Sequence, residues 1–229
     1  MFSPTSETKP KLYLPAIRHN TYYYEMVTFK ISNTLFKVPQ YAFIQQSVIF
    51  RDMFSLPLGE SGQGEGQTDD NPIQLPEVTV EEFSILLSLL YPQPIIGQLI
   101  HMPELQASEW LSVLRFASKY EFSLLRAYAI TMLEGKLDPV RRIEVSRAYV
   151  IKQWLHPALI ELANRRESIT LEEGRILGLE TLVKLSAVRD SIHAHKEVKL
   201  EAVGSRRIGL MKNEVLNVDE LIAQEFECL

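Results

Sequence analysis

The sequence predicts an α+β protein, with a small sheet flanked by helices and followed by an all-α helical extension. Two observations lead to this fold class. Apolar and polar residues alternate between Met26 and Val38, which is the period of β-strands, whereas apolar residues beyond Ser47 recur mostly at the spacing of amphipathic helices. A chain of 229 residues with 46% apolar residues is also long enough to bury a core of this kind.

The alternating segment predicts a β-hairpin. Residues 26–32 form a strand with one buried face, because every second residue is apolar. Asn33 and Thr34 then predict a turn, and residues 35–38 predict the returning strand. A third, short strand is expected within residues 72–78.

Beyond Pro39 the spacing changes to that of helices. A short connecting helical turn is expected first, and Ser47 is placed to cap the helix after it. The apolar stripe of that second helix consists of Ile49, Phe50, Met53 and Phe54.

Further helix boundaries carry their own signals. Thr79 and Glu82 form a capping box, and so do Thr170 and Glu173. Asp138 precedes a proline at the first helical position, and Gly178 predicts a helix end. Helices are expected over residues 79–91, 108–120, 123–137, 141–150, 154–165, 170–178 and 179–193. Beyond residue 196 the periodicity weakens, although residues 213–229 could form one terminal amphipathic helix.

Two segments lack regular periodicity. Residues 58–71 hold four of the ten glycines and almost no apolar surface, so we expect residues 59–70 to be a flexible surface loop that cannot pack. The loop lacks the Gly-Lys-Ser/Thr ending of a phosphate-binding loop. Prolines make residues 91–106 irregular, with a short extended piece expected at Ile95–Ile96.

The composition limits which classes of partner we expect and in which cellular compartment the chain is expected. The formal charge of -5 gives no bulk attraction to nucleic acids or anionic membranes, and no run of about 18 apolar residues could span a bilayer. We therefore expect no direct nucleic-acid partner and no membrane partner. The single cysteine, Cys228, suits a reducing compartment, so a cytoplasmic or nuclear location is expected.

Residues with catalytic potential do not form a recognisable site. His193 and His195 lie two positions apart, which places them about 200° apart around a helix, so they cannot hold one metal ion together. No nucleophile elbow, zinc-binding helix motif or dinucleotide fingerprint occurs. The sequence thus predicts no catalytic residues, no cofactor and no metal, and an enzyme without a short motif remains the alternative.

The order of the apolar residues resembles that of the BTB/POZ domain family over residues 22–135. The most specific stretches are SVIFRDMF and FSILLSLLY. The residues that carry the resemblance are Phe29, Phe36, Val38, Phe43, Ser47, Phe50, Met53–Phe54, Phe83, Leu86–Leu87, Leu90–Tyr91, Ala117 and Leu125.

The resemblance implies a domain organisation and a function. An N-terminal arm covers residues 1–21, the BTB/POZ domain residues 22–135, a BACK-like helical region residues 136–195, and a C-terminal tail residues 196–229. Stretches such as FRDMFSLPLGE and WLHPALIEL look like those of fungal BTB-containing proteins. The implied activity is binding of other proteins, without catalysis.

Three specific hypotheses follow from the resemblance. Leu58 and Glu60 match the apolar-x-Glu pattern of cullin-binding adaptors, which makes a ubiquitin-ligase adaptor the leading hypothesis. The alternative is an oligomeric scaffold or transcription-related regulator, with the apolar and aromatic residues 12–24 as a homodimer surface. An enzyme is the third. Met26 and Gln40 stand where transcription factors of the family carry an acidic and a basic residue, and Pro39 replaces a common histidine, so co-repressor binding of that type is not implied.

Overall fold

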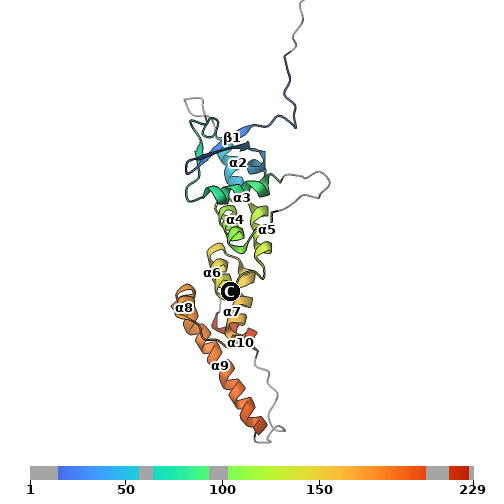
Figure 1. Cartoon of the computed structure of the whole chain (residues 1–229). Helices are drawn as coiled ribbons and strands as arrows, with labels where there is room; N and C mark the ends of the chain where they lie inside the picture. Colours follow the sequence, from blue (N-terminus) through green and yellow to red (C-terminus); the bar gives the residue numbers. More distant parts are fainter. Residues whose placement is uncertain (1–14, 57–63, 93–102, 205–216, 227–229) are drawn as a thin grey trace, which may run out of the picture. The chain divides into compact units, whose positions relative to one another are not determined.

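The structure is a computed structural model that describes residues 15–56, 64–92, 103–204 and 217–226, and only the backbone of residues 196–204. The chain forms two compact units, Met1–His101 and Met102–Leu229, and Figure 1 labels most of their helices and strand β1. The first contains a small sheet and three helices, and the second contains the remaining helices. The predicted α+β fold class with a helical extension is confirmed.

The sheet has three strands in the order β2-β1-β3. Strand β1 (Met26–Ile31) pairs antiparallel with β2 (Thr34–Pro39) and parallel with β3 (Ile73–Gln74). The predicted hairpin is therefore confirmed, but its turn lies one residue earlier than expected. Ser32 has a left-handed φ of 54°, and β2 already begins at Thr34.

The core of the first unit is built around Phe29. This ring is completely buried and lies 4.9 Å from Phe43, 5.8 Å from Phe50 and 5.2 Å from Phe83, measured between ring centroids. The strand thus contacts one aromatic side chain from each of three helices: α1 (Tyr41–Gln46), α2 (Val48–Ser55) and α3 (Val80–Leu90). Aromatic packing fixes these helices against one face of the sheet.

The predicted caps of α2 and α3 are present. The Ser47 hydroxyl accepts a hydrogen bond from the Phe50 amide at 3.1 Å. Thr79 and Glu82 form the expected capping box, with bonds of 3.1 and 3.2 Å. Both helices therefore begin where the sequence predicted.

The glycine-rich segment is packed at one residue, where no packing was expected. Residues 57–63 lie outside the described part of the chain; within residues 64–71 Gly66 is buried, whereas Glu65, Gln67 and residues 69–71 are exposed. The Gly66 carbonyl accepts a hydrogen bond from the Thr28 amide at 2.7 Å, and the Asp69 carboxylate accepts one from the Thr28 hydroxyl at 3.3 Å. Thr28, at the centre of β1, is therefore inaccessible to solvent, whereas Met26 is exposed and Lys30 is partly exposed.

The second unit contains seven helices within the described residues. Their order follows the sequence prediction, and the helix-bounding signals at Asp138, Thr170, Glu173 and Gly178 are all used. The helices are α4 (Ala107–Lys119), α5 (Ser123–Leu133), α6 (Pro139–Tyr149), α7 (Lys152–Asn164), α8 (Leu171–Leu177), α9 (Leu179–Gly204) and α10 (Val218–Glu225).

Arginine side chains tie neighbouring helices of this unit together at their C-terminal ends. Arg126 on α5 donates to the carbonyl of Tyr149, the last residue of α6. Arg147 on α6 donates to the Leu177 carbonyl at the end of α8, and Arg189 on α9 donates to the Leu162 carbonyl near the end of α7. A cation at a helix C-terminus both satisfies free carbonyls and complements the helix dipole.

Three helices differ from their predicted lengths, and the first, α5, ends at Leu133 instead of residue 137. Helix α9 continues to Gly204, beyond the predicted end at residue 193, and α10 is confined to Val218–Glu225. Asn217 starts α10 because its side chain accepts from the Asp219 amide. No helix in the described ranges is long and apolar enough to cross a membrane.

Replacing Gly66 by alanine tests the packed turn. Gly66 has a φ of +82°, and an added Cβ would lie 2.9 Å from side-chain atoms of both Ile73 and Val27. We expect a loss in the free energy of unfolding of about 1–2 kcal/mol from the backbone and about 1–3 kcal/mol from overpacking. Urea denaturation followed by circular dichroism measures the total loss in the free energy of unfolding.

Gly135→Ala is the matched control, because Gly135 has a φ of +71° but nothing within 4 Å of an added Cβ. It should show only the backbone contribution. Equal losses for the two variants would mean that Gly66 does not pack against the sheet.

Candidate protein-binding surfaces

The described residues do not form a cluster that could bind a metal ion. No group of three or more His, Cys, Asp or Glu side chains in these ranges could hold a metal ion. His19, His156 and His193 lie in the arm, in α7 and in α9, respectively. Exposed apolar groups and one pocket form two surfaces that could bind a partner.

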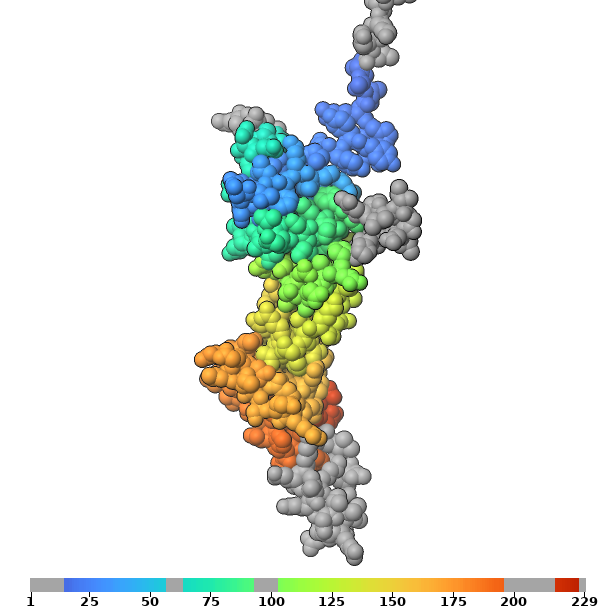
Figure 2. All heavy atoms as spheres, in the orientation of Figure 1, coloured from blue at the N-terminus to red at the C-terminus, as the bar shows by residue number. Residues whose placement is uncertain are grey.

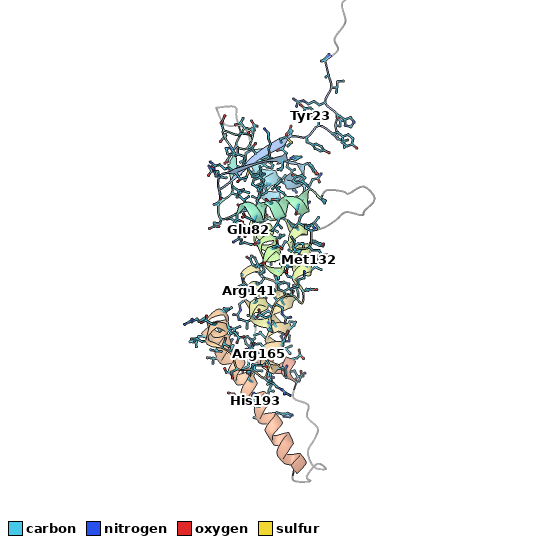
Figure 3. The ribbon with its side chains drawn as sticks, viewed as in Figure 1. Tyr23, Glu82, Met132, Arg141, Arg165 and His193 are labelled. Atoms are coloured by element: carbon cyan, nitrogen blue, oxygen red, sulfur yellow. The ribbon has the colours of Figure 1, made fainter. Side chains whose placement is uncertain are left out.

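Exposed aromatic side chains follow one another at the junction of the arm and the sheet. We call this the tyrosine surface, and it consists of Tyr22, Tyr23, Tyr24, Met26 and Tyr41. The exposed fractions of these side chains fall from 74% at Tyr22 to 40% at Tyr41. Figure 3 shows Tyr23 among the side chains of the arm. Because contiguous exposed aromatic groups are uncommon on a surface that contacts only water, the tyrosine surface is a candidate interface.

The tyrosine surface is anchored to the core through Tyr91. Tyr41 contacts Tyr24 at 5.3 Å and Tyr91 at 5.7 Å between ring centroids. The Tyr91 hydroxyl donates to the Pro39 carbonyl at the end of β2. Burial, with a smaller contribution from Tyr41, raises the pKa of Tyr91 above its usual value, so the phenol stays protonated as a donor.

The arm itself has local structure next to the sheet. The His19 Nδ1 atom accepts hydrogen bonds from the amides of Thr21 at 3.1 Å and Tyr22 at 3.2 Å. The Arg18 guanidinium lies 4.7 Å from the centre of the Tyr23 ring. These contacts hold residues 18–23 in a turn and leave the tyrosine rings facing solvent.

A second candidate surface is a pocket of about 590 Å³ formed by α4, α5 and the residues just before α4. Trp110 lines it and packs edge-to-face on the half-exposed Tyr128, with 5.5 Å between ring centroids. Met132, Glu104 and Lys136 also line the pocket. A lining of apolar side chains with a few charged groups is typical of binding pockets.

The sequence-predicted contact residues are not placed by the structure. Leu58 and Glu60 lie outside the described residues, so neither their geometry nor their relation to either candidate surface is given. The nearest described residues are Ser55, where α2 ends, and the exposed Leu56.

Sequence reasoning identified the tyrosines of the arm but missed the α4–α5 pocket. A signal was present: Leu124, Tyr128 and Met132 lie four residues apart on α5, about 100° around the helix from the buried Leu125, Ala129 and Leu133. A second apolar stripe beside the buried one indicates a further contact surface.

Glu173 has the most strongly perturbed carboxyl among the described residues, and its role is structural. Its carboxylate accepts two hydrogen bonds from the Arg165 guanidinium, at 2.7 and 2.8 Å, and one from the Thr170 amide at 2.8 Å. These bonds, the Arg165 pair first, hold the pKa of Glu173 at about 2 and raise the pKa of Arg165. The group thus ties the α7–α8 connection to the start of α8.

Comparison with known families places the first half of the chain. The family model described as BTB/POZ domain matches residues 20–136, just over half of the sequence. No curated protein matches the chain significantly. The matched residues include the sheet, both candidate surfaces, α4 and α5.

Replacing Glu173 by glutamine tests the carboxylate's structural role. Its pKa is about 2 in the folded protein and 4.5 when unperturbed, so the stabilisation is present above about pH 4.5 and is lost as the pH falls towards 2. With allowance for partial exposure, we expect Glu173→Gln to cost about 1 kcal/mol at pH 7, and the difference from wild type to shrink through this window.

Denaturant unfolding at pH 7, 4 and 3 measures this difference. Glu172→Gln is the matched control, because its pair with Arg175 is well exposed and should contribute little. A difference between wild type and Glu173→Gln that stays constant with pH would contradict the assignment.

Proposed function

The chain belongs to the BTB/POZ domain family, and on that premise we propose that it is a non-enzymatic scaffold that forms homodimers through the tyrosine surface. Binding other polypeptides is what this family's domain does. The observation that carries the proposal is the exposure of Tyr22, Tyr23 and Tyr24 next to Met26 and Tyr41.

The chemistry of these side chains favours association with another protein surface. Tyrosine buries a large apolar area at low cost in side-chain entropy and keeps a hydroxyl for hydrogen bonds at the interface rim. The surface is continuous with the core through Tyr41 and Tyr91, so part of it is already rigid before binding. A rigid aromatic patch of this kind supports a two-fold interface in which the same residues of both copies meet.

The pocket between α4 and α5 favours a second role, as an adaptor. A scaffold that binds only its own copy needs no further pocket, whereas Trp110, Tyr128 and Met132 line a separate pocket. We propose that a cullin is one partner of such an adaptor and that Leu58 and Glu60 contact it, as their position after Met53–Phe54 suggests. The BACK-like helical region at residues 136–195 and a fungal origin are parts of the same proposal.

Co-repressor binding through a charged pocket is not proposed. Gln40, where the family's transcription factors carry a basic residue, donates a hydrogen bond to the Glu25 carboxylate, and Met26 is an exposed apolar side chain. The neighbouring surface is thus aromatic and apolar in place of a pair of opposite charges. A cytoplasmic or nuclear location, which the lone Cys228 supports, completes the proposal.

Substituting two arm tyrosines tests the homodimer. Multi-angle light scattering of the wild-type chain at micromolar concentration should give the mass of two copies. Tyr22→Ser combined with Tyr23→Ser should weaken the dimer at least about tenfold, equivalent to about 1.4 kcal/mol, because aromatic anchors contribute most of an interface's binding energy.

Leu179→Ser combined with Val183→Ser is the matched control, since both side chains are at least as exposed as Tyr23 but lie on α9. This variant should keep the wild-type mass. A monomeric wild type, or equal weakening in both variants, would count against the proposed interface.

The adaptor role is tested by calorimetric titration of the chain with a purified cullin. Leu58→Ala should cost about 1–3 kcal/mol of binding free energy, as expected for an apolar anchor at an interface, and leave the melting temperature unchanged. Leu56→Ala, which also removes an apolar side chain just after α2, should leave binding intact. If the folded wild type does not bind a cullin at all, the adaptor role is wrong and the scaffold proposal is unaffected.

A further inference from the structure

The C-terminal helix α10 lies in a groove between α7 and α9 (Figure 1). Two of its side chains, Ile222 and Phe226, are buried in a core cluster. The cluster residues that α7 and α9 contribute are Ala158, Leu159, Leu162, Ala163, Leu185, Val188 and Ile192. The red atoms of α10 are visible beside α7 in Figure 2.

Polar contacts at the groove's rim set the direction of the bound helix. Asp219, in the first turn of α10, lies 3.4 Å from the His156 Nε2 atom on α7. The Lys184 ammonium of α9 lies 5.6 Å from the centre of the Phe226 ring at the other end. The groove therefore presents an apolar floor with one basic side chain from each of its two walls.

Helix α10 has the pattern of a helix-in-groove ligand. Its inward residues Val218, Leu221, Ile222 and Phe226 are spaced i, i+3, i+4 and i+8, and its solvent side carries acidic groups. Isolated helices shorter than about 12 residues are marginal in water, so these eight residues owe their helical form to the groove. The association of α10 is thus a binding event within one chain.

We propose that the α7–α9 groove is a binding site for an acidic amphipathic helix, and that α10 occupies it as an internal ligand. A helix of another protein with the same apolar spacing, and an acidic residue placed to meet His156, competes with α10 for the groove. The tethered α10 has an effective concentration on the order of millimolar, so a competitor binds well only when it is tighter or when α10 is weakened. This makes α10 a built-in regulator of access to the site.

A labelled peptide tests the competition in the full-length chain. The probe is a fluorescein-labelled peptide of residues 214–229 with Cys228→Ser, and binding is followed by fluorescence anisotropy. The full-length double variant Ile222→Ala, Phe226→Ala should bind the peptide at least about tenfold more tightly than the wild type, because the internal competitor is weakened. Gln224→Ala, an exposed change on α10, should behave as the wild type, and a peptide with Ile222→Asp should not bind.

If the double variant does not fold, hydrogen exchange of the wild-type chain tests independently whether α10 leaves the groove on its own. Amides of residues 219–226 should exchange through a local opening, faster than the buried amides of α7. A folded double variant that binds the peptide no more tightly than the wild type overturns the proposal. Exchange of α10 and α7 in a single common event also overturns it, because α10 would then never leave the groove on its own.

Discussion

The packing of phenylalanine rings around Phe29 is the interaction on which the first unit depends. One strand residue contacts Phe43, Phe50 and Phe83, so β1 is the element that holds α1, α2 and α3 together. Val27, Phe29 and Ile31 are buried on the helix side, and Thr28 is buried where it bonds to the turn at Gly66. The tyrosine surface at the N-terminal end of β1 is thus held by a rigid base, which lowers the entropy lost when a partner binds.

The second unit has no strand within the described residues, so its helices are held together in another way. Helices α4 to α9 are connected by short loops, and the arginines of α5, α6 and α9 donate to carbonyls at the ends of α6, α8 and α7. The Arg165–Glu173 pair does the same for the connection between α7 and α8. Helix α10 is held mainly by the buried Ile222 and Phe226, with the exposed Asp219–His156 contact at one end and Lys184 over the Phe226 ring at the other. This difference is the physical basis for treating α10 as a ligand of the helical unit.

Features set by local chemistry could be predicted from the sequence, and features set by contacts distant in sequence could not. Ser47, Thr79–Glu82, Asp138 and Thr170–Glu173 act within four residues of themselves, so each helix start was predicted. The packing of Gly66 depends on Ile73 and on Thr28, which is distant in sequence. Helix α9 continues to Gly204, past the last residue of its apolar stripe, so the stripe did not show where the helix ends. Likewise, three consecutive tyrosines at residues 22–24 could be recognised in the sequence as an aromatic segment. The pocket at Trp110 could not, because it forms only where α4 and α5 pack together.

The central claim is that this BTB/POZ chain meets a second copy of itself through the tyrosine surface. The most direct measurement is photo-crosslinking from Tyr23, replaced by benzoylphenylalanine, in an equal mixture of ¹⁴N-labelled and ¹⁵N-labelled chains. The account predicts mixed-isotope cross-links from residue 23 of one copy to the tyrosine surface of the other. Cross-links found only within single-isotope peptides, or between copies at residues outside that surface, would contradict it.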